Sequence, residues 1–304
     1  PVFYSFVAIT RTDYTLFAPQ DMLPEDFPKN RVCRYSDINV YLSNIDSDMR
    51  VWLCKSQGSY WMLKHLCKTS KLNFNQTPIA LMKAIKNNVE IKATKNAHLK
   101  DGIAVTTFIH WVKNNIGKVP MSELSASDFL KNCRKKQAGY KEPSFTTISG
   151  YNSNGAIIHY TPTVSSNATL ESKGFLLVDS GGQYSDGTTD ITRTIALGPL
   201  TPKMKEYYTA VLKAHIALAS AEFSEGTTGA DLDAVTRKPL TDLGLNYNHG
   251  TGHGVGHMLS VHEGPQNISP RRNSQQMLPG MITSNEPGVY IPGEFGIRLE
   301  NEIL

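Results

Sequence analysis

The feature that most constrains the fold is a pair of aspartates placed in strongly apolar strand patterns. Asp179 ends the apolar run 175–178, and Asp190 follows within the next strand-like segment, 189–197. Acidic groups in such strands are costly to bury unless they are paired or bind a metal ion. Each aspartate taken alone could instead cap a turn or pair with Arg193, because aspartate is common in turns.

A second unusual segment is rich in both histidine and glycine. Four of the nine histidines lie between positions 249 and 262, with glycines between them. These glycines disfavour a continuous helix and let the backbone approach a ligand closely. The segment lacks the second histidine of an HExxH zinc motif, and Val255 interrupts the dinucleotide-binding glycine pattern. A surface loop with incidental histidines is the alternative for this segment taken alone.

Two glutamates extend the pattern near the end of the chain. Glu286 ends the strand pattern 281–286, and Glu300 lies in the strand pattern 296–303. A half-exposed strand with one polar face would explain Glu300 alone. Together, however, the two aspartates, one histidine and the two glutamates supply mostly hard oxygen ligands and one imidazole. This set suits a pair of divalent ions, which at about 3.5–4 Å from each other can generate a hydroxide at neutral pH.

The remaining pattern divides the chain near Thr77. Residues 1–76 show a mixed pattern, with strands predicted at 2–10, 39–42 and 51–54 and a helix at 59–68. From Thr77 onward helical patterns come first, and strand patterns dominate after Gly139. The helices predicted there open at Thr77-Pro78 and span 87–115, 125–139, 201–223 and 228–243. The predicted strands span 145–149, 156–160, 175–180, 189–197, 281–286 and 296–303.

Composition excludes several classes of function. The net charge of +4, from 31 Lys and Arg against 27 Asp and Glu, is too small over 304 residues to indicate binding to nucleic acid or an anionic membrane. No apolar run reaches the roughly 18 residues of a membrane span. The cysteines form no CxxC pair, which favours free thiols in a reducing compartment; they are Cys33, Cys54, Cys67 and Cys133. The chain begins with Pro1, shows no signal peptide and ends in a strand pattern, so we expect a piece of a longer protein.

These motifs together resemble the pita-bread metallopeptidases, and within them the aminopeptidase P group of Xaa-Pro aminopeptidases, of the eukaryotic cytosolic type. The similarity extends over nearly the whole chain and includes the segments 1–6, 77–87, 154–160, 179–194, 249–256, 285–288 and 298–301. The resemblance implies an α+β fold. A pita-bread catalytic domain, in which helices cover a curved and mainly antiparallel sheet, would occupy 77–304 and be truncated at its C-terminal end. Part of a smaller creatinase-like α/β domain would occupy 1–76.

The resemblance also implies a set of metal ligands, matched by position. Asp179 would chelate one metal with both oxygens, and Asp190 and Glu300 would bridge the two metals. His253 and Glu286 would complete the second metal site. Members of the family usually work with manganese (Mn²⁺), although ligand softness and geometry would equally allow Co²⁺, Zn²⁺ or Fe²⁺.

Four further residues match positions that line the site in the family. His159 and His262 would contact the scissile carbonyl and transfer protons, and His249 would shape the pocket for the proline ring. Arg298 would orient the bridging carboxylates.

The resemblance implies hydrolysis of the bond between an N-terminal residue and a following proline, by a hydroxide that bridges the two metals. Proline-containing peptides would be the substrates, the protein would be a cytoplasmic homodimer, and neither nucleic acid nor membrane would be a partner. Two alternatives stay open. The first is a prolidase that cuts Xaa-Pro dipeptides. The second is a binding protein on the same fold that has lost catalysis.

Overall fold

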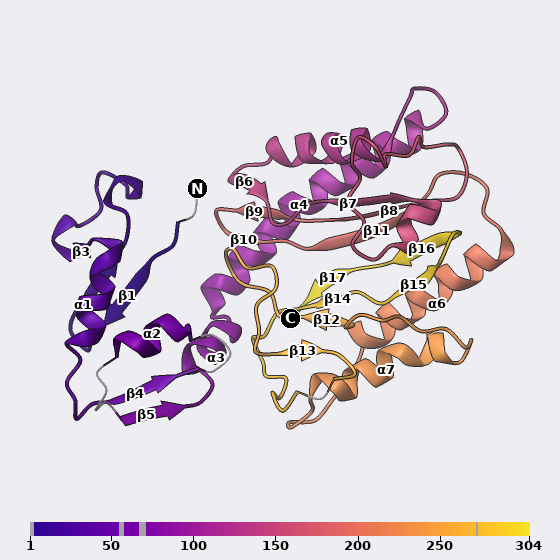
Figure 1. Cartoon of the computed structure of the whole chain (residues 1–304). Coiled ribbons are helices and arrows are strands. Elements are labelled where there is room, and N and C mark those ends of the chain that lie inside the picture. Colours follow the sequence, from indigo (N-terminus) through magenta and orange to yellow (C-terminus); the bar gives the residue numbers. More distant parts are fainter. Residues whose placement is uncertain (1–2, 55–57, 67–70, 272) are drawn as a thin grey trace. The chain divides into compact units, whose positions relative to one another are not determined.

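The computed structural model describes residues 3–54, 58–66, 71–271 and 273–304 (Figure 1). Val2, Cys67 and the end of the helix predicted at 59–68 lie outside these residues. The chain divides into two units, Pro1–Pro78 and Ile79–Leu304, which are described separately. Within the described residues, every helix is too short or too polar to span a lipid bilayer.

The first unit combines short strands and helices. Strand β2 (Tyr14–Phe17) pairs antiparallel with β1 (Phe6–Ile9) and parallel with β3 (Val32–Cys33), and β4 (Arg50–Leu53) pairs parallel with β5 (Lys71–Phe74). Helices α1 (Ile38–Ser43) and α2 (Tyr60–His65) complete the unit, together with three 3-10 turns, Gln20–Met22, Lys29–Arg31 and Tyr35–Asp37.

The strand predicted at 39–42 is wrong, because these residues lie in α1. Ile38 and Leu42 are buried, whereas Val40 between them is 58% exposed. A strand would place all three side chains on one face, while a helix places Val40 on the face opposite the other two. The local preference of β-branched and aromatic residues for strands is therefore overruled by packing.

Among the described residues, α3 (Pro78–Ala84) leads from the first unit into the second, where α4 (Asn88–Asn115), α5 (Glu123–Lys135), α6 (Pro202–Ala219) and α7 (Gly229–Thr241) follow. The long helices start at polar caps that satisfy their first free N–H groups. Asn87 accepts from the N–H groups of Val89 and Glu90, and Thr201 accepts from that of Met204.

Within the described part of the second unit, the strands form five small sheets. A three-stranded antiparallel sheet has the order β11 (Ile191–Ala196), β8 (Phe175–Ser180), β7 (Ile148–Tyr151), and another has the order β10 (Gly187–Thr188), β9 (Gly182–Tyr184), β6 (Tyr140–Pro143). The remaining pairs are β12 (Gly252–His253) with β13 (Asn267–Ile268), β14 (Thr283–Asn285) with β17 (Asn301–Ile303), and β15 (Gly288–Ile291) with β16 (Phe295–Arg298).

Helices lie on two sides of these strands (Figure 1). One hydrophobic cluster joins α4 and α5 to the sheet around Leu176, Val178 and Ile195. Another joins α6 and α7 to β15 and β16 around Phe295 and Ile297. The first cluster buries one side of β8 and β11, and the second buries one side of β15 and β16. The polar residues at the ends of these strands therefore lie between the two layers of helices.

Several elements differ from the sequence predictions, and three differences in the second unit are large enough to describe. Helix α5 is capped by Ser122, which exchanges hydrogen bonds with Ser125, so the cap lies three residues before the predicted one. Residues 156–160, predicted as a strand, follow a 3-10 turn (Asn152–Ala156) and form no strand. The strand predicted at 296–303 is interrupted at Leu299 and Glu300, because β16 and β17 pair with different partners.

Candidate metal centre

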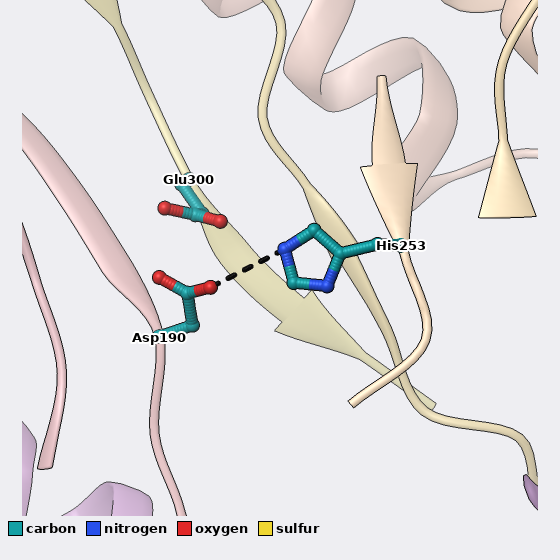
Figure 2. Close-up of side chains that lie close together, drawn as sticks. All are labelled: Asp190, His253 and Glu300. Atoms are coloured by element: carbon teal, nitrogen blue, oxygen red, sulfur yellow. Dashed lines mark ion pairs between the residues drawn. The ribbon is translucent and has the colours of Figure 1, made fainter. Parts of the chain in front are cut away.

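Three separate parts of the second unit each place one metal-ligating side chain at the same point. The ligand atoms of Asp190, His253 and Glu300 all lie within 4.8 Å of one another. Asp190 immediately precedes β11, His253 lies in β12, and Glu300 separates β16 from β17. Figure 2 shows the three side chains pointing toward one another, with an ion pair of 3.4 Å between His253 Nε2 and Asp190 Oδ2.

Two further acidic residues border this cluster. Asp179 lies in β8, opposite Thr192 of β11, and Glu286 directly follows β14. Glu286 Oε1 is 3.6 Å from His253 Nε2. All five predicted ligands line one cavity of about 760 Å³. The structure thus brings together every residue that the sequence analysis proposed for metal binding.

The metal-free fold disfavours the ionised form of three of the acidic side chains. Burial raises the pKa of Asp190 to about 6 and that of Glu286 to about 8. Burial and the charge of Asp190 raise the pKa of Glu300 well above its usual value. Burial lowers the pKa of His253, but its hydrogen bond to Asp190 and the charge of Glu286 more than offset this and raise it to about 9.

Two carboxylate oxygens at the centre also lack donors. Asp179 Oδ1 and Asp190 Oδ1 are buried and have no hydrogen-bond partner among the described residues. A buried acceptor without a donor is unfavourable unless a cation occupies the space in front of it. Clustered carboxylates, unpartnered oxygens and one imidazole therefore fit hard or borderline divalent cations.

Arg298 connects the centre to a pair of residues on its wall. Its Nη2 donates to Asp179 Oδ2 at 2.7 Å, and its Nη1 donates to the hydroxyl of Tyr290 at 2.6 Å. Arg298 is 1% exposed. Its fixed fork therefore orients the carboxylate of Asp179 from behind.

The carbonyl of Gly250 determines the tautomer of His249. His249 Nδ1 lies 2.7 Å from the carbonyl of Gly250 and must donate to it, so Nε2 accepts from the Tyr290 hydroxyl at 2.9 Å. Burial lowers the pKa of His249 to about 4, which keeps the ring neutral. The sequence analysis missed Tyr290, because its position in an apolar strand does not distinguish it from a core aromatic residue.

His159 and His262 line the same cavity and are both exposed. The ring of His262 lies edge-on to that of His253, with 4.3 Å between centroids. Burial lowers the pKa of His262. Neither ring makes a hydrogen bond within the described parts of the chain, so both can meet a ligand in the cavity.

A buried polar group also braces the backbone beside His249. Arg237 of α7 pairs with Asp233 at 2.8 Å and donates to the carbonyls of Tyr247 and His249, each at 2.7 Å. It was not predicted, because an arginine four residues after an aspartate in a helix is more often an exposed ion pair. His257, the remaining histidine of the segment 249–262, contacts Thr94 Oγ1 at 3.2 Å instead of joining the ligand cluster.

Comparison with known proteins finds relatives that match over the whole chain. The model of metallopeptidase family M24 matches residues 92–304, and that of the creatinase/prolidase N-terminal domain matches residues 1–90. Xaa-Pro aminopeptidase 1 of Dictyostelium discoideum is 41% identical over 100% of this chain and 50% of its own length. The chain therefore spans about half the length of the curated relatives it matches.

Solved structures confirm the predicted α+β pita-bread fold. The X-prolyl aminopeptidase of Caenorhabditis elegans, described as a cytosolic enzyme with a di-nuclear active site, has a TM-score of 0.91. It is 32% identical and covers 99% of this chain and 51% of that one. The prolidase of Pyrococcus horikoshii OT3 has a TM-score of 0.81, with 26% identity over 99% of this chain and 84% of its own.

Proposed function

We propose a function from the premise that this chain belongs to metallopeptidase family M24. It carries the hydrolytic centre of an Xaa-Pro aminopeptidase, which removes an N-terminal residue that precedes proline. The observation that carries the proposal is the convergence of the five ligand side chains on one cavity. The names of relatives at about 40% identity support the choice of reaction.

The centre would hold two divalent ions. Asp179 would chelate one ion, Asp190 and Glu300 would bridge both, and His253 and Glu286 would complete the second site. We propose Mn²⁺ as the working ion, with Co²⁺, Zn²⁺ and Fe²⁺ as the alternatives that metal analysis would separate. When bound, two such ions supply a hydroxide nucleophile at neutral pH and Lewis-acid polarisation of the scissile carbonyl.

The histidines divide the remaining work according to their hydrogen bonds. His159 and His262 have ring nitrogens available to the substrate; His159 would contact the carbonyl oxygen and His262 would assist proton delivery to the leaving proline nitrogen. Both ring nitrogens of His249 are already engaged by Gly250 and Tyr290. This supports a role for His249 in shaping the proline pocket.

The chemistry of proline explains why a dedicated centre is needed. The proline ring fixes φ and removes the N–H donor by which ordinary peptidases hold their substrates. Recognition must therefore come from shape and from the acyl side of the bond. Part of the cavity lining is apolar, in contrast to the carboxylates, and consists of Phe145, Ile148 and Ile158.

The decisive experiment uses metal-stripped protein, an Xaa-Pro-Xaa tripeptide and an Xaa-Pro dipeptide, each with and without added Mn²⁺. Mn²⁺-dependent release of the first residue from the tripeptide, with little cleavage of the dipeptide, is the expected result. Cleavage of the dipeptide alone would support the prolidase alternative, which the Pyrococcus horikoshii relative favours. No cleavage and no bound metal would support the non-catalytic alternative.

The proposal extends to assembly and location. We propose a homodimer in a reducing, cytoplasmic compartment, and the free thiols of Cys33 and Cys133 are compatible with that location. Sedimentation of the metal-loaded protein tests the homodimer, and a mass of one chain would refute it.

A further inference from the structure

A carboxylate outside the metal centre is completely buried at the first residue of α5. Glu123 is 0% exposed, and it forms no ion pair with a lysine or arginine within the described residues. Four donors surround it instead. Oε1 accepts from the N–H of Tyr151 at 2.7 Å and from Asn154 Nδ2 at 2.9 Å. Oε2 accepts from the N–H of Ala168 at 2.9 Å and lies 2.9 Å from the hydroxyl of Tyr160.

All four donors belong to the segment 151–168, which carries His159. The donors lie at its beginning, middle and end, so one side chain ties together a stretch that has little regular structure. The backbone strengthens the connection, because the N–H of Glu123 donates to the carbonyl of Ala168 at 3.1 Å. Ser149 Oγ also donates to the carbonyl of Glu123, at 3.0 Å.

His159 depends on this segment for its position. Its ring is exposed and forms no hydrogen bond within the described residues, so only the neighbouring backbone orients it. On one side, the carbonyl of Ile158 accepts from Arg298 Nη2 at 3.4 Å. On the other side, Tyr160 is 8% exposed, and its hydroxyl lies between Glu123 and the carbonyl of Ser166, which is 2.8 Å away.

An isolated buried carboxylate would be a costly way to hold a loop if stability were the only requirement. A carboxylate has about four acceptor positions, and here four donors point at them. Such a saturated network favours one arrangement of its donors over all others. An apolar residue could fill the space, but it would not define where each donor lies.

We propose that Glu123 is a positioning residue for His159: it fixes the 151–168 segment so that the imidazole faces the cavity beside the metal ligands. The inference rests on the proposed function, in which His159 contacts the scissile carbonyl. Among the described residues, Glu123 does not line the cavity and forms no hydrogen bond with a metal ligand, so it acts on the site through the segment that carries His159.

The test is a double-mutant cycle on Mn²⁺-loaded protein with the Xaa-Pro-Xaa tripeptide. Glu123→Ala should lower kcat/KM on the order of 100-fold, as expected when a reacting group is displaced by about 1 Å. Glu123→Gln keeps the shape and one acceptor oxygen, so its loss should be smaller. In a His159→Ala background, the same changes should have almost no further effect, because the group they position is gone. Tyr160→Phe, which deletes one hydroxyl, repeats the test with a milder change.

A second readout does not depend on activity. Hydrogen exchange of the backbone N–H groups in 151–168 should accelerate in Glu123→Gln, while the bound Mn²⁺ per chain stays at the wild-type value. Leu130→Ala is the matched control, since Leu130 is buried in the same helix and belongs to a hydrophobic cluster. Leu130→Ala should lower Tm. It should change kcat/KM by the same factor in the wild-type and in the His159→Ala background.

The outcomes separate the two proposals. Wild-type protein that cleaves no Xaa-Pro substrate would refute the proposed function. Active wild-type protein in which Glu123→Ala and His159→Ala reduce kcat/KM independently would overturn the positioning role alone. Unchanged hydrogen exchange in 151–168 for Glu123→Gln would overturn it as well.

Discussion

Removing divalent metal should destabilise the protein, and the loss should grow as the pH rises. The carboxylates responsible are those of the metal centre, above all Glu286. Burial raises the pKa of Glu286 from 4.5 to about 8 in the metal-free fold. The unfolded chain therefore releases this proton near its ordinary pKa, whereas the metal-free fold retains it until about pH 8. A folded state that binds more protons than the unfolded state loses stability as the pH rises through this interval.

The interval from pH 6.5 to pH 8 is the best one for this measurement, because the groups with raised pKa values act there in one direction. Below pH 6.5, His249 has the opposite effect on stability. Its pKa in the fold, about 4, lies below the 6.5 of the unfolded chain, so the fold becomes more stable as the pH rises toward 6.5. Above pH 6.5, His253 has the same sign as Glu286, since its pKa is raised to about 9. One pKa unit corresponds to about 1.4 kcal/mol, so Glu286 alone accounts for a loss of about 2 kcal/mol over this interval. In a domain of this size that lowers Tm by about 4–8 °C.

Thermal unfolding with EDTA or with saturating Mn²⁺, at several pH values between 6.5 and 8, measures the effect. The metal-free Tm should fall with pH, whereas the loaded protein should not show this fall, because bound cations keep the carboxylates ionised. Glu286→Gln should reduce the slope of the metal-free profile and leave the part that is due to His253. Glu294→Gln, at an exposed residue paired with Lys203, should leave it unchanged. A metal-free Tm that stays constant or rises between pH 6.5 and pH 8 would contradict this prediction.

Three substitutions test the residues around the centre. Arg298→Lys should weaken Mn²⁺ binding about 10–100-fold in competition with a chelator, because lysine cannot contact Asp179 and Tyr290 together; wild-type affinity would contradict the orienting role. Tyr290→Phe removes the donor to His249, so kcat/KM should fall while bound Mn²⁺ per chain stays constant, and loss of the metal would point to a different role. Thr188→Val deletes a hydroxyl 3.1 Å from the carbonyl of Leu259, a residue held at a φ of 62°. Thr188→Val should lower the free energy of unfolding by about 1–3 kcal/mol, measured with denaturant. An unchanged free energy of unfolding would show that this contact does not hold the backbone at Leu259.

The long helices could be predicted because their signals are local. Asn87 caps α4 together with Glu90, Thr201 caps α6 with proline next to it, and Gly244 follows α7 at a φ of 70°. Short elements carry too few residues for periodicity to decide between a strand and a helix. The segments 39–42 and 156–160 were therefore predicted from composition alone, and packing decided against both.

The residues of the site also differ in whether the sequence alone could predict them. Each predicted ligand breaks a local rule, such as an acid within an apolar strand or a histidine among glycines, and this makes it visible in the sequence. Glu123 and Tyr290 break none. An acidic residue in the first turn of a helix is favourable on an exposed surface as well, so its sequence position does not indicate burial. Only the packing of 151–168 against α5, a long-range contact, converts Glu123 into a buried acceptor.

The three histidines of the cavity differ in how many ring nitrogens the protein occupies, and this difference separates their chemistry. Both nitrogens of His249 are engaged, so it cannot exchange a proton without breaking a buried hydrogen bond. A group that transfers protons needs an available nitrogen, which His159 and His262 retain toward the cavity. A ring without hydrogen bonds, however, must be oriented by packing or by its backbone. His262 is oriented by the ring of His253, a proposed metal ligand. Among the described residues, His159 has no such ring contact, so we infer that its position comes from the backbone, which the carboxylate of Glu123 holds through the segment 151–168.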